Sequence, residues 1–319
     1  MQVNLLFRSP CAKFACEKAK SMLSILIPTY NYDCTQLVGD LQAQALQAGI
    51  EHEIIVADDA SPDTIYKVAN RAINDNPYCR LIELETNVGR ARIRNLLAQE
   101  ARHEWLLFMD ADAKVVSPTF IADYMAHMEG DAEVVCGGLL HADTLPSPDV
   151  SLRYTYECKA DKTRAARYRK QAPYERFTPF NFMIRRSTFL TIRFDETIHE
   201  YGHEDTLFGI ELQQRMVPLL HIDNPLQHLG LETNEVFLNK TRAALRNLAS
   251  MESAMQGHSS LIGAYRKLCR MGMDRVLARI YAKHGQALAV RLSREHPSLT
   301  LFALYKLAYY CYIKRNAED

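Results

Sequence analysis

Short apolar runs alternate with longer amphipathic stretches through the first half of the chain. The runs, rich in aliphatic residues, fall at 23–27, 53–57, 80–84, 105–109 and 133–137. Between them, apolar residues recur with helical spacing over 35–48, 62–74, 89–101 and 117–129. Continuous apolar strands separated by helices are typical of a parallel sheet covered on both faces. The pattern therefore predicts an α/β fold with a mostly parallel, Rossmann-like sheet flanked by helices.

Short segments that are rich in polar residues follow four of these predicted strands. They are Pro28, Thr29, Tyr30 and Asn31; Asp58 and Asp59; Asn87 and Gly89; and Asp110, Ala111 and Asp112. Ligands of such sheets bind at the carboxyl ends of the strands. We therefore expect one polar rim that is large enough for a nucleotide.

The usual glycine-rich phosphate-binding motifs are missing from this rim. No G-x-G-x-x-G follows the first strand and no G-x-x-x-x-G-K-[ST] occurs, which disfavours a dinucleotide oxidoreductase and a P-loop NTPase. Asp110 and Asp112 offer another way to hold phosphates, because residues i and i+2 of an extended chain project to the same side. Carboxylate oxygens suit Mg²⁺ or Mn²⁺ shared with a diphosphate. Solvated loop acids are the alternative interpretation of this pair.

Five sequence stretches together indicate the class of protein. They are LSILIPTYN (23–31), IIVADDASPD (54–63), NVGRARIRN (87–95), WLLFMDADA (105–113) and YGHEDTLFG (201–209). Their order and spacing resemble those of family 2 glycosyltransferases, which have the GT-A fold, over about residues 22–230. The chain is most similar to bacterial members that build surface polysaccharides. The resemblance implies inverting, metal-dependent transfer of a sugar from a nucleotide sugar to a hydroxyl of a glycan or lipid-linked glycan.

The resemblance also assigns roles to single residues. Glycosyl transfer needs a carboxylate base for the attacking hydroxyl, and the family position of this base falls on Asp205, with Glu204 beside it. Asp59 matches the residue that receives the uracil imide hydrogen, which favours UDP, and Asp58 supports its loop. Arg94 matches an arginine near the nucleotide. Helix capping by Glu204 and Asp205 is the alternative for that pair.

His228 follows a short apolar run that is interpreted as a last strand. Related enzymes place a histidine here that joins the second aspartate of the D-x-D motif on the metal. The expected ligands of Mn²⁺ or Mg²⁺ are therefore Asp112 and His228, together with Asp110. A structural histidine is the alternative.

The distribution of charge along the sequence bears mainly on the role of the C-terminal part. Residues 240–319 hold 14 basic and 5 acidic residues, a net charge of +9, which leaves −9 on residues 1–239 and zero overall. No nucleic-acid partner is expected. The tyrosine-rich run 299–313 precedes Lys314 and Arg315, so it is expected either to contact an anionic membrane or to pack on the body. The basic, tyrosine-rich segment 151–176 is expected beside the acceptor or as a solvated helix face.

The expected organisation has three parts: an N-terminal extension (1–21), a GT-A domain (22–232) and a C-terminal helical region (233–319). The eight scattered cysteines, without C-x-x-C spacing, indicate reduced thiols. No apolar run reaches the roughly 20 residues of a membrane span, and the N-terminus has no signal-peptide core. The expected location is cytoplasmic, with peripheral contact at the inner face of the cell membrane as a further option.

Two other functions compete with the transferase. A nucleotide-sugar pyrophosphorylase would share a related sheet, but its GxGTR-like loop is replaced by Pro-Thr-Tyr-Asn after the first strand. A binding module without activity would have no need for Asp112, Asp205 and His228 together. The residues of the site therefore favour the transferase, since a fold alone does not decide function.

Overall fold

The structure is a computed structural model that describes residues 22–160, 163–198 and 201–316. The expected extension 1–21, with Cys11 and Cys16, lies outside the described residues. The six described cysteines are free thiols, as the sequence predicts.

A seven-stranded sheet forms the centre of the molecule, in the order β3-β2-β1-β4-β8-β6-β9. Its strands are β1 (Met22–Thr29), β2 (Glu51–Asp58), β3 (Cys79–Glu83), β4 (Trp105–Met109), β6 (Val134–Cys136), β8 (Asn181–Arg185) and β9 (Leu219–His221). Strands β1 to β4 pair in parallel, whereas β8 runs antiparallel between β4 and β6. A small second sheet joins β5 (Ala113–Val115), β10 (Leu226–His228) and β7 (Leu139–Leu140).

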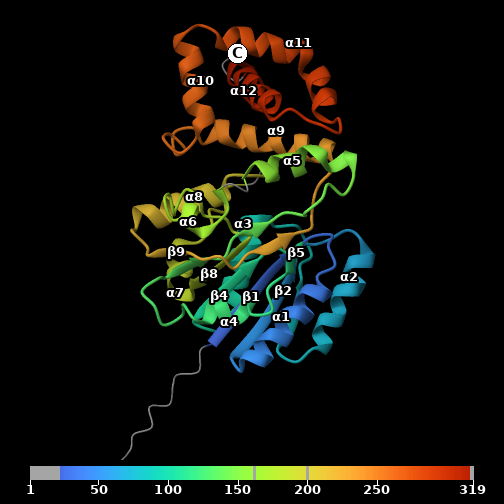
Figure 1. Cartoon of the computed structure of the whole chain (residues 1–319), viewed down its shortest axis with the longest axis vertical. Coiled ribbons are helices and arrows are strands. Elements are labelled where there is room, and N and C mark those ends of the chain that lie inside the picture. The colour runs from blue at the N-terminus through green and yellow to red at the C-terminus, as the bar shows by residue number, and fades with distance from the viewer. Residues whose placement is uncertain (1–21, 161–162, 199–200, 317–319) are drawn as a thin grey trace, which may run out of the picture.

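The described residues form twelve α-helices, of which α1 to α8 lie around the sheets (Figure 1). The first eight are α1 (Thr35–Ala48), α2 (Thr64–Arg71), α3 (Arg90–Glu100), α4 (Phe120–Met125), α5 (Ser151–Ala160), α6 (Ala166–Arg169), α7 (Arg186–Ile192) and α8 (Glu204–Gln214). The last four are α9 (Asn234–Ser250), α10 (Ser260–Arg270), α11 (Asp274–Leu292) and α12 (Leu299–Asn316). Short 3₁₀ helices cover Ala72–Asp75 and Pro148–Val150.

Both faces of the main sheet are buried, which explains why the central positions of its strands are mostly apolar. Successive residues of a strand point to opposite faces. Ile25 and Ile27 of β1 pack in one core cluster with residues of α1 and α4, and Leu26 packs in another with residues of α3 and α8. The prediction of a mostly parallel α/β sheet covered by helices is confirmed. The antiparallel strand β8 was not predicted.

Helices α9 to α12 form the C-terminal helical region, which lies beyond α5 and α8 at one end of the molecule (Figure 1). Apolar residues of α12 pack inside this region: Tyr305, Ala308, Tyr310 and Cys311 are fully buried. Lys314 Nζ pairs with Glu252 at 3.0 Å, and Arg315 Nε pairs with Asp274 at 2.8 Å. The run 299–313 thus packs on the body, the second of its two expected roles. In the described part of the chain, no helix is long and apolar enough to cross a membrane.

Candidate active site

A cavity of about 580 Å³ opens at the carboxyl ends of β1 to β4; we call it the rim cavity. Residues that follow each of these four strands line it together, as the sequence predicts. From the predicted set it contains Pro28, Thr29, Tyr30, Asp59, Asn87, Gly89, Arg94, Asp110, Ala111 and Asp112. These residues, up to 84 positions apart in the chain, therefore share one surface.

Asp59 holds the loop that follows β3. Its Oδ1 accepts a hydrogen bond from the Val88 N–H at 2.6 Å, and its Oδ2 accepts one from the Gly89 N–H at 3.0 Å. Gly89 has a φ of 85°, a left-handed conformation that glycine adopts without strain, at the start of α3. Each carboxylate oxygen keeps a second lone pair, so Asp59 fixes the loop and still offers an acceptor to a ligand.

Two of the predicted nucleotide-binding residues lie behind the cavity wall. Asp58 accepts hydrogen bonds from the N–H and the hydroxyl of Ser61, and the Asn31 N–H donates to the Ser61 Oγ at 2.7 Å. Neither Asp58 nor Asn31 lines the rim cavity. In this structure Asp58 and Asn31 connect the loops after β1 and β2 through Ser61 and stabilise those loops.

The first acid of the D-x-D motif is held by an arginine of α3. Arg94 Nη2 lies 2.5 Å from Asp110 Oδ1, and the Arg94 side chain is only 3% exposed. Buried, charge-assisted pairs of this kind are strong and fix geometry. Asp110 is therefore held by Arg94, whereas Asp112 contacts His228.

Asp112, whose side chain is 26% exposed, contacts the buried His228, which in turn contacts the buried Glu157. His228 Nε2 lies 3.2 Å from Asp112 Oδ2, and His228 Nδ1 lies 3.1 Å from Oε1 of Glu157 on α5. Arg153 Nε contacts the same Glu157 oxygen at 2.6 Å. The sequence did not predict Glu157 as part of the site, although its i,i+4 spacing from Arg153 indicates an ion pair on one helix face.

The charges of Asp112, His228 and Glu157 stabilise one another. Burial alone would lower the pKa of His228, but its hydrogen bonds to Asp112 and Glu157 and their charges raise that pKa to about 9. Burial alone would raise the pKa of Glu157, but His228 and Arg153 lower it to about 2. Burial likewise opposes ionisation of Asp112, yet His228 and Arg90 lower its pKa. Both carboxylates therefore stay ionised on either side of the imidazole.

These groups fit a divalent metal that is shared with a ligand. Among the described residues, no three His, Cys, Asp or Glu side chains form a ready metal cage. Asp112 Oδ2 and His228 Nε2 would supply two adjacent donor atoms once a bound cation displaces the imidazole proton, and a hard cation takes its remaining ligands from phosphate and water. Gly230 leaves the space for this arrangement, because a Cβ there would lie 2.0 Å from Asp112 Oδ2.

A second cavity, of about 430 Å³, adjoins the first; we call it the helical cavity. It lies among α5, α8, α9 and α12, and Glu204 and Asp205 of the first turn of α8 line it. Arg90, Tyr201 and Lys240 line both cavities. The D-x-D acids and Asp205 thus face two neighbouring spaces with a common wall.

The turn before α8 presents Asp205 to this space. Gly202 has a φ of 100°, and a Cβ there would lie 2.7 Å from the Cβ of Ala244 on α9. The Asn247 amide donates to the Gly202 carbonyl oxygen at 2.6 Å, so α9 holds the turn in place. Burial and the charge of Glu204 raise the pKa of Asp205, against the opposing Thr206 N–H and His203. Asp205 is therefore a better proton acceptor than an ordinary aspartate.

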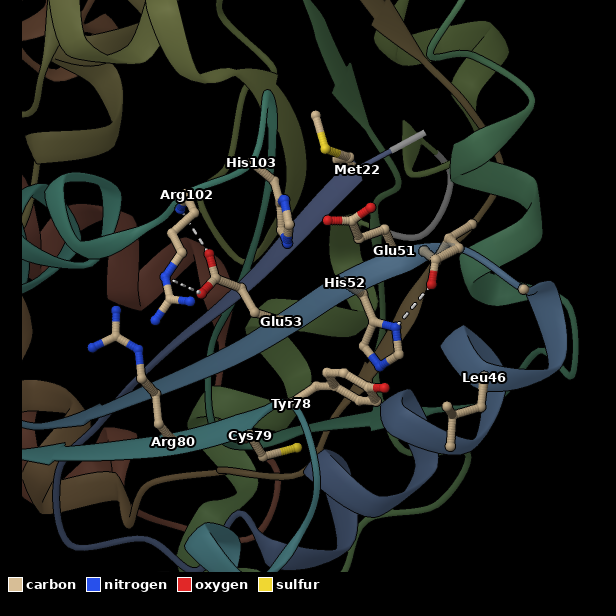
Figure 2. A pocket seen from close by; sticks show the side chains of 12 residues that line it. Met22, Leu46, Glu51, His52, Glu53, Tyr78, Cys79, Arg80, Arg102 and His103 are labelled. Atoms are coloured by element: carbon tan, nitrogen blue, oxygen red, sulfur yellow. Dashed lines mark hydrogen bonds and ion pairs between the residues drawn. The ribbon is translucent and has the colours of Figure 1, made fainter. Parts of the chain in front are cut away.

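A larger cavity, of about 800 Å³, opens at the opposite ends of the strands (Figure 2). Two of its charged groups pair with each other, with Arg102 Nε 3.8 Å from Glu53 Oε2, and Arg80 pairs with Glu100 outside the cavity. Glu53 also accepts a hydrogen bond from the Ser24 hydroxyl at 2.7 Å. The rings of His52 and Tyr78 lie in tilted contact, with their centroids 5.3 Å apart. Ligands of open α/β sheets bind at the carboxyl ends of the strands, so size alone does not make this cavity the active site.

A polar rim with paired aspartates, beside a second cavity that Glu204 and Asp205 line, is the arrangement expected of a GT-A glycosyltransferase. The family model "Glycosyl transferase family 2" matches residues 24–193, more than half of the chain. The chain therefore belongs to glycosyl transferase family 2.

Relatives of known name match shorter segments. The teichoic acid poly(glycerol phosphate) polymerase of Staphylococcus epidermidis is 30% identical over 96 residues, which cover 30% of this chain and 13% of that protein. The poly(ribitol-phosphate) β-N-acetylglucosaminyltransferase TarS of Staphylococcus aureus is 33% identical over 92 residues, which cover 28% of this chain and 16% of that one. The matched segments thus span well under half of the first relatives' own lengths.

Solved structures match almost the whole chain. The mannosyltransferase PcManGT of Pyrobaculum calidifontis, in complex with GDP-Man and Mn²⁺, has a TM-score of 0.56 at 14% identity, covering 93% of this chain and 87% of that one. Residues 1–349 of S. aureus TarS, in complex with UDP-GlcNAc, have a TM-score of 0.51 at 18% identity, covering 93% and 92%. At these identities the likeness shows a shared fold, which confirms the predicted GT-A architecture.

Proposed function

We propose that the chain is an inverting, metal-dependent glycosyltransferase of bacterial surface-polysaccharide synthesis. It moves a hexosyl or N-acetylhexosaminyl group from a nucleotide sugar, with UDP favoured, to a hydroxyl of a glycan or lipid-linked glycan. Residues 22–232 form the transferase domain and residues 233–319 a helical region beside it. The observation that carries the proposal is the pair of adjoining cavities, with the D-x-D acids in one and Asp205 in the other.

The rim cavity is the proposed donor site. Asp59 offers acceptor lone pairs to a base N–H, and Arg94 holds Asp110 beside the expected diphosphate. Asp112 and His228 would hold Mn²⁺ or Mg²⁺, whose charge stabilises the leaving diphosphate when the metal is bound. The nucleotides in the two related structures, UDP-GlcNAc and GDP-Man, are compatible with this assignment.

The helical cavity is the proposed acceptor site. The acceptor oxygen attacks the anomeric carbon, the bond from that carbon to the diphosphate oxygen breaks, and the hydroxyl proton passes to the Asp205 carboxylate. Attack from the face opposite the leaving group inverts the anomeric configuration. The raised pKa of Asp205 suits a base that must gain a proton during the reaction.

A donor screen tests the proposal directly. Hydrolysis and transfer are measured for a panel of UDP-, GDP- and dTDP-sugars with Mn²⁺, and again with EDTA. We expect activity with a UDP-sugar, its loss in EDTA, and a product of inverted configuration by NMR. Full activity in EDTA would contradict the metal role, a retained configuration would contradict the mechanism, and tight binding without turnover would favour a nucleotide-sugar-binding module.

A further inference from the structure

One of the basic side chains that line the helical cavity has no acidic partner among the described residues. Four basic side chains line it, one each from α3, α5, α9 and α12. Three have acidic partners: Arg90 with Glu204 at 3.7 Å, Arg153 with Glu157 at 2.6 Å, and Lys240 with Glu232. The fourth is Lys306 of α12, and no carboxylate of the described residues pairs with it.

Aromatic rings hold the Lys306 ammonium in place. Its Nζ lies 4.8 Å from the ring centroid of Phe302 and 5.4 Å from that of Tyr156 on α5. Burial and the like charge of Lys159 lower the pKa of Lys306. A partly buried ammonium without a counter-charge is costly, and ring contacts offset only part of that cost. A bound anion would therefore stabilise the Lys306 ammonium.

The rest of the cavity suits a small polyhydroxylated molecule. Its volume of about 430 Å³ is within the range of roughly 300–1,000 Å³ for small-molecule sites. Tyr156, Tyr201, Phe237 and Phe302 line it, and their rings offer apolar faces for the C–H groups of a sugar or polyol. Asp205 lines the same cavity, so its carboxylate and the Lys306 ammonium share one space.

We propose that this cavity selects an acceptor that carries a phosphate group, with the phosphate at Lys306 and the reacting hydroxyl at Asp205. A lysine ammonium acts as a point charge that binds a phosphate oxygen well. The inference rests on the proposed function and names its acceptor class. The phosphate belongs either to a soluble sugar or polyol phosphate or to a lipid headgroup, and both share this chemistry.

Binding measurements on the full chain with UDP and Mn²⁺ present test the inference. Glycerol 3-phosphate and glycerol are titrated calorimetrically, and vesicles of phosphatidylglycerol are compared with vesicles of phosphatidylcholine. The variants are Lys306→Met, which keeps the apolar stem, and Lys306→Arg, which keeps the charge. Lys283→Met is the matched control, because Lys283 is exposed on α11 outside the cavity and its loss changes the net charge equally.

We expect Lys306→Met to lose about 10- to 100-fold in affinity for the phosphate probe, the range for a charge-assisted hydrogen bond. Lys306→Arg and Lys283→Met should stay close to wild type, and UDP affinity should not change. Lys306-dependent binding of glycerol 3-phosphate indicates a soluble acceptor; dependence seen only with phosphatidylglycerol vesicles indicates a lipid headgroup.

An unchanged affinity in Lys306→Met, or an equal loss in Lys283→Met, would overturn the inference. So would a wild-type protein that binds neither phosphate probe. In each of these cases UDP binding in the rim cavity is measured separately. Normal UDP binding then leaves the proposed transferase intact, whereas a wild-type chain without nucleotide binding removes the proposed function itself.

Discussion

Replacing Gly230 with alanine tests whether the position of Asp112 controls metal-dependent donor binding. The added Cβ would lie 2.0 Å from Asp112 Oδ2, 2.7 Å from its Cγ and 2.9 Å from its Cβ. All three distances are shorter than real Cβ contacts, so the carboxylate must move by about 1 Å. That movement breaks the 3.2 Å contact with His228 Nε2. A misplacement of about 1 Å at a reacting centre costs on the order of 10²-fold in rate.

The assay is kcat/KM for transfer, together with UDP affinity measured with and without Mn²⁺. We expect Gly230→Ala to lose about 10²-fold in kcat/KM and most of the gain in UDP affinity that Mn²⁺ provides. UDP affinity without metal should remain, because the base-binding side of the cavity is not touched. Overpacking at such a position costs about 1–3 kcal/mol of stability, so the fold should survive.

Gly39→Ala is the matched control. Gly39 is exposed in α1 and an added Cβ meets nothing within 4 Å. Alanine is the better helix former by about 1 kcal/mol, so this variant should be fully active and slightly more stable. Wild-type kcat/KM and Mn²⁺-dependent UDP binding in Gly230→Ala would refute the reasoning, because Asp112 would then tolerate displacement.

Three further predictions follow from the site. Asp205→Asn should lower turnover by about 10²–10⁴-fold with unchanged UDP affinity; near-normal turnover would remove Asp205 as the base. Because the pKa of Asp205 is raised above 3.8, the wild-type kcat should fall as the pH drops through that raised value, and a pH–rate profile of Asp205→Asn should lack this limb. Glu157→Gln should weaken Mn²⁺-dependent UDP binding by about 10- to 100-fold, since partners that orient a metal-binding histidine have effects of this size. Titrations of UDP with and without Mn²⁺ check this, and equal losses in both would indicate a general structural role.

The parts of the site that follow strands could be predicted because they depend on local order along the chain. Once β1 to β4 are parallel neighbours, Thr29, Asp59 and Asp112 must lie at one edge of the sheet. Their individual partners could not be predicted in the same way. Arg94 pairs with Asp110 rather than with Asp112 because of how α3 packs on the sheet.

Residues that act through tertiary contacts were the ones missed. Glu157 contacts His228 across 71 positions of sequence, and nothing in the local pattern of α5 indicates which face is buried. Lys306 reaches the cavity from the last helix of the chain. Strand β8 was missed for a similar reason: its pairing with β4 and β6 joins distant segments, and a short apolar run does not reveal its direction.

The hydrogen bond from Asn247 to the Gly202 carbonyl has a consequence for engineering. It fixes the turn that precedes Asp205, the proposed base, to α9, so the helical region cannot be exchanged without affecting that turn. A chimera that grafts foreign helices after β10 would need an amide at this position and a small residue opposite Gly202, where Ala244 now lies. Without both, we expect the grafted protein to keep the rim cavity but to lose the position of Asp205.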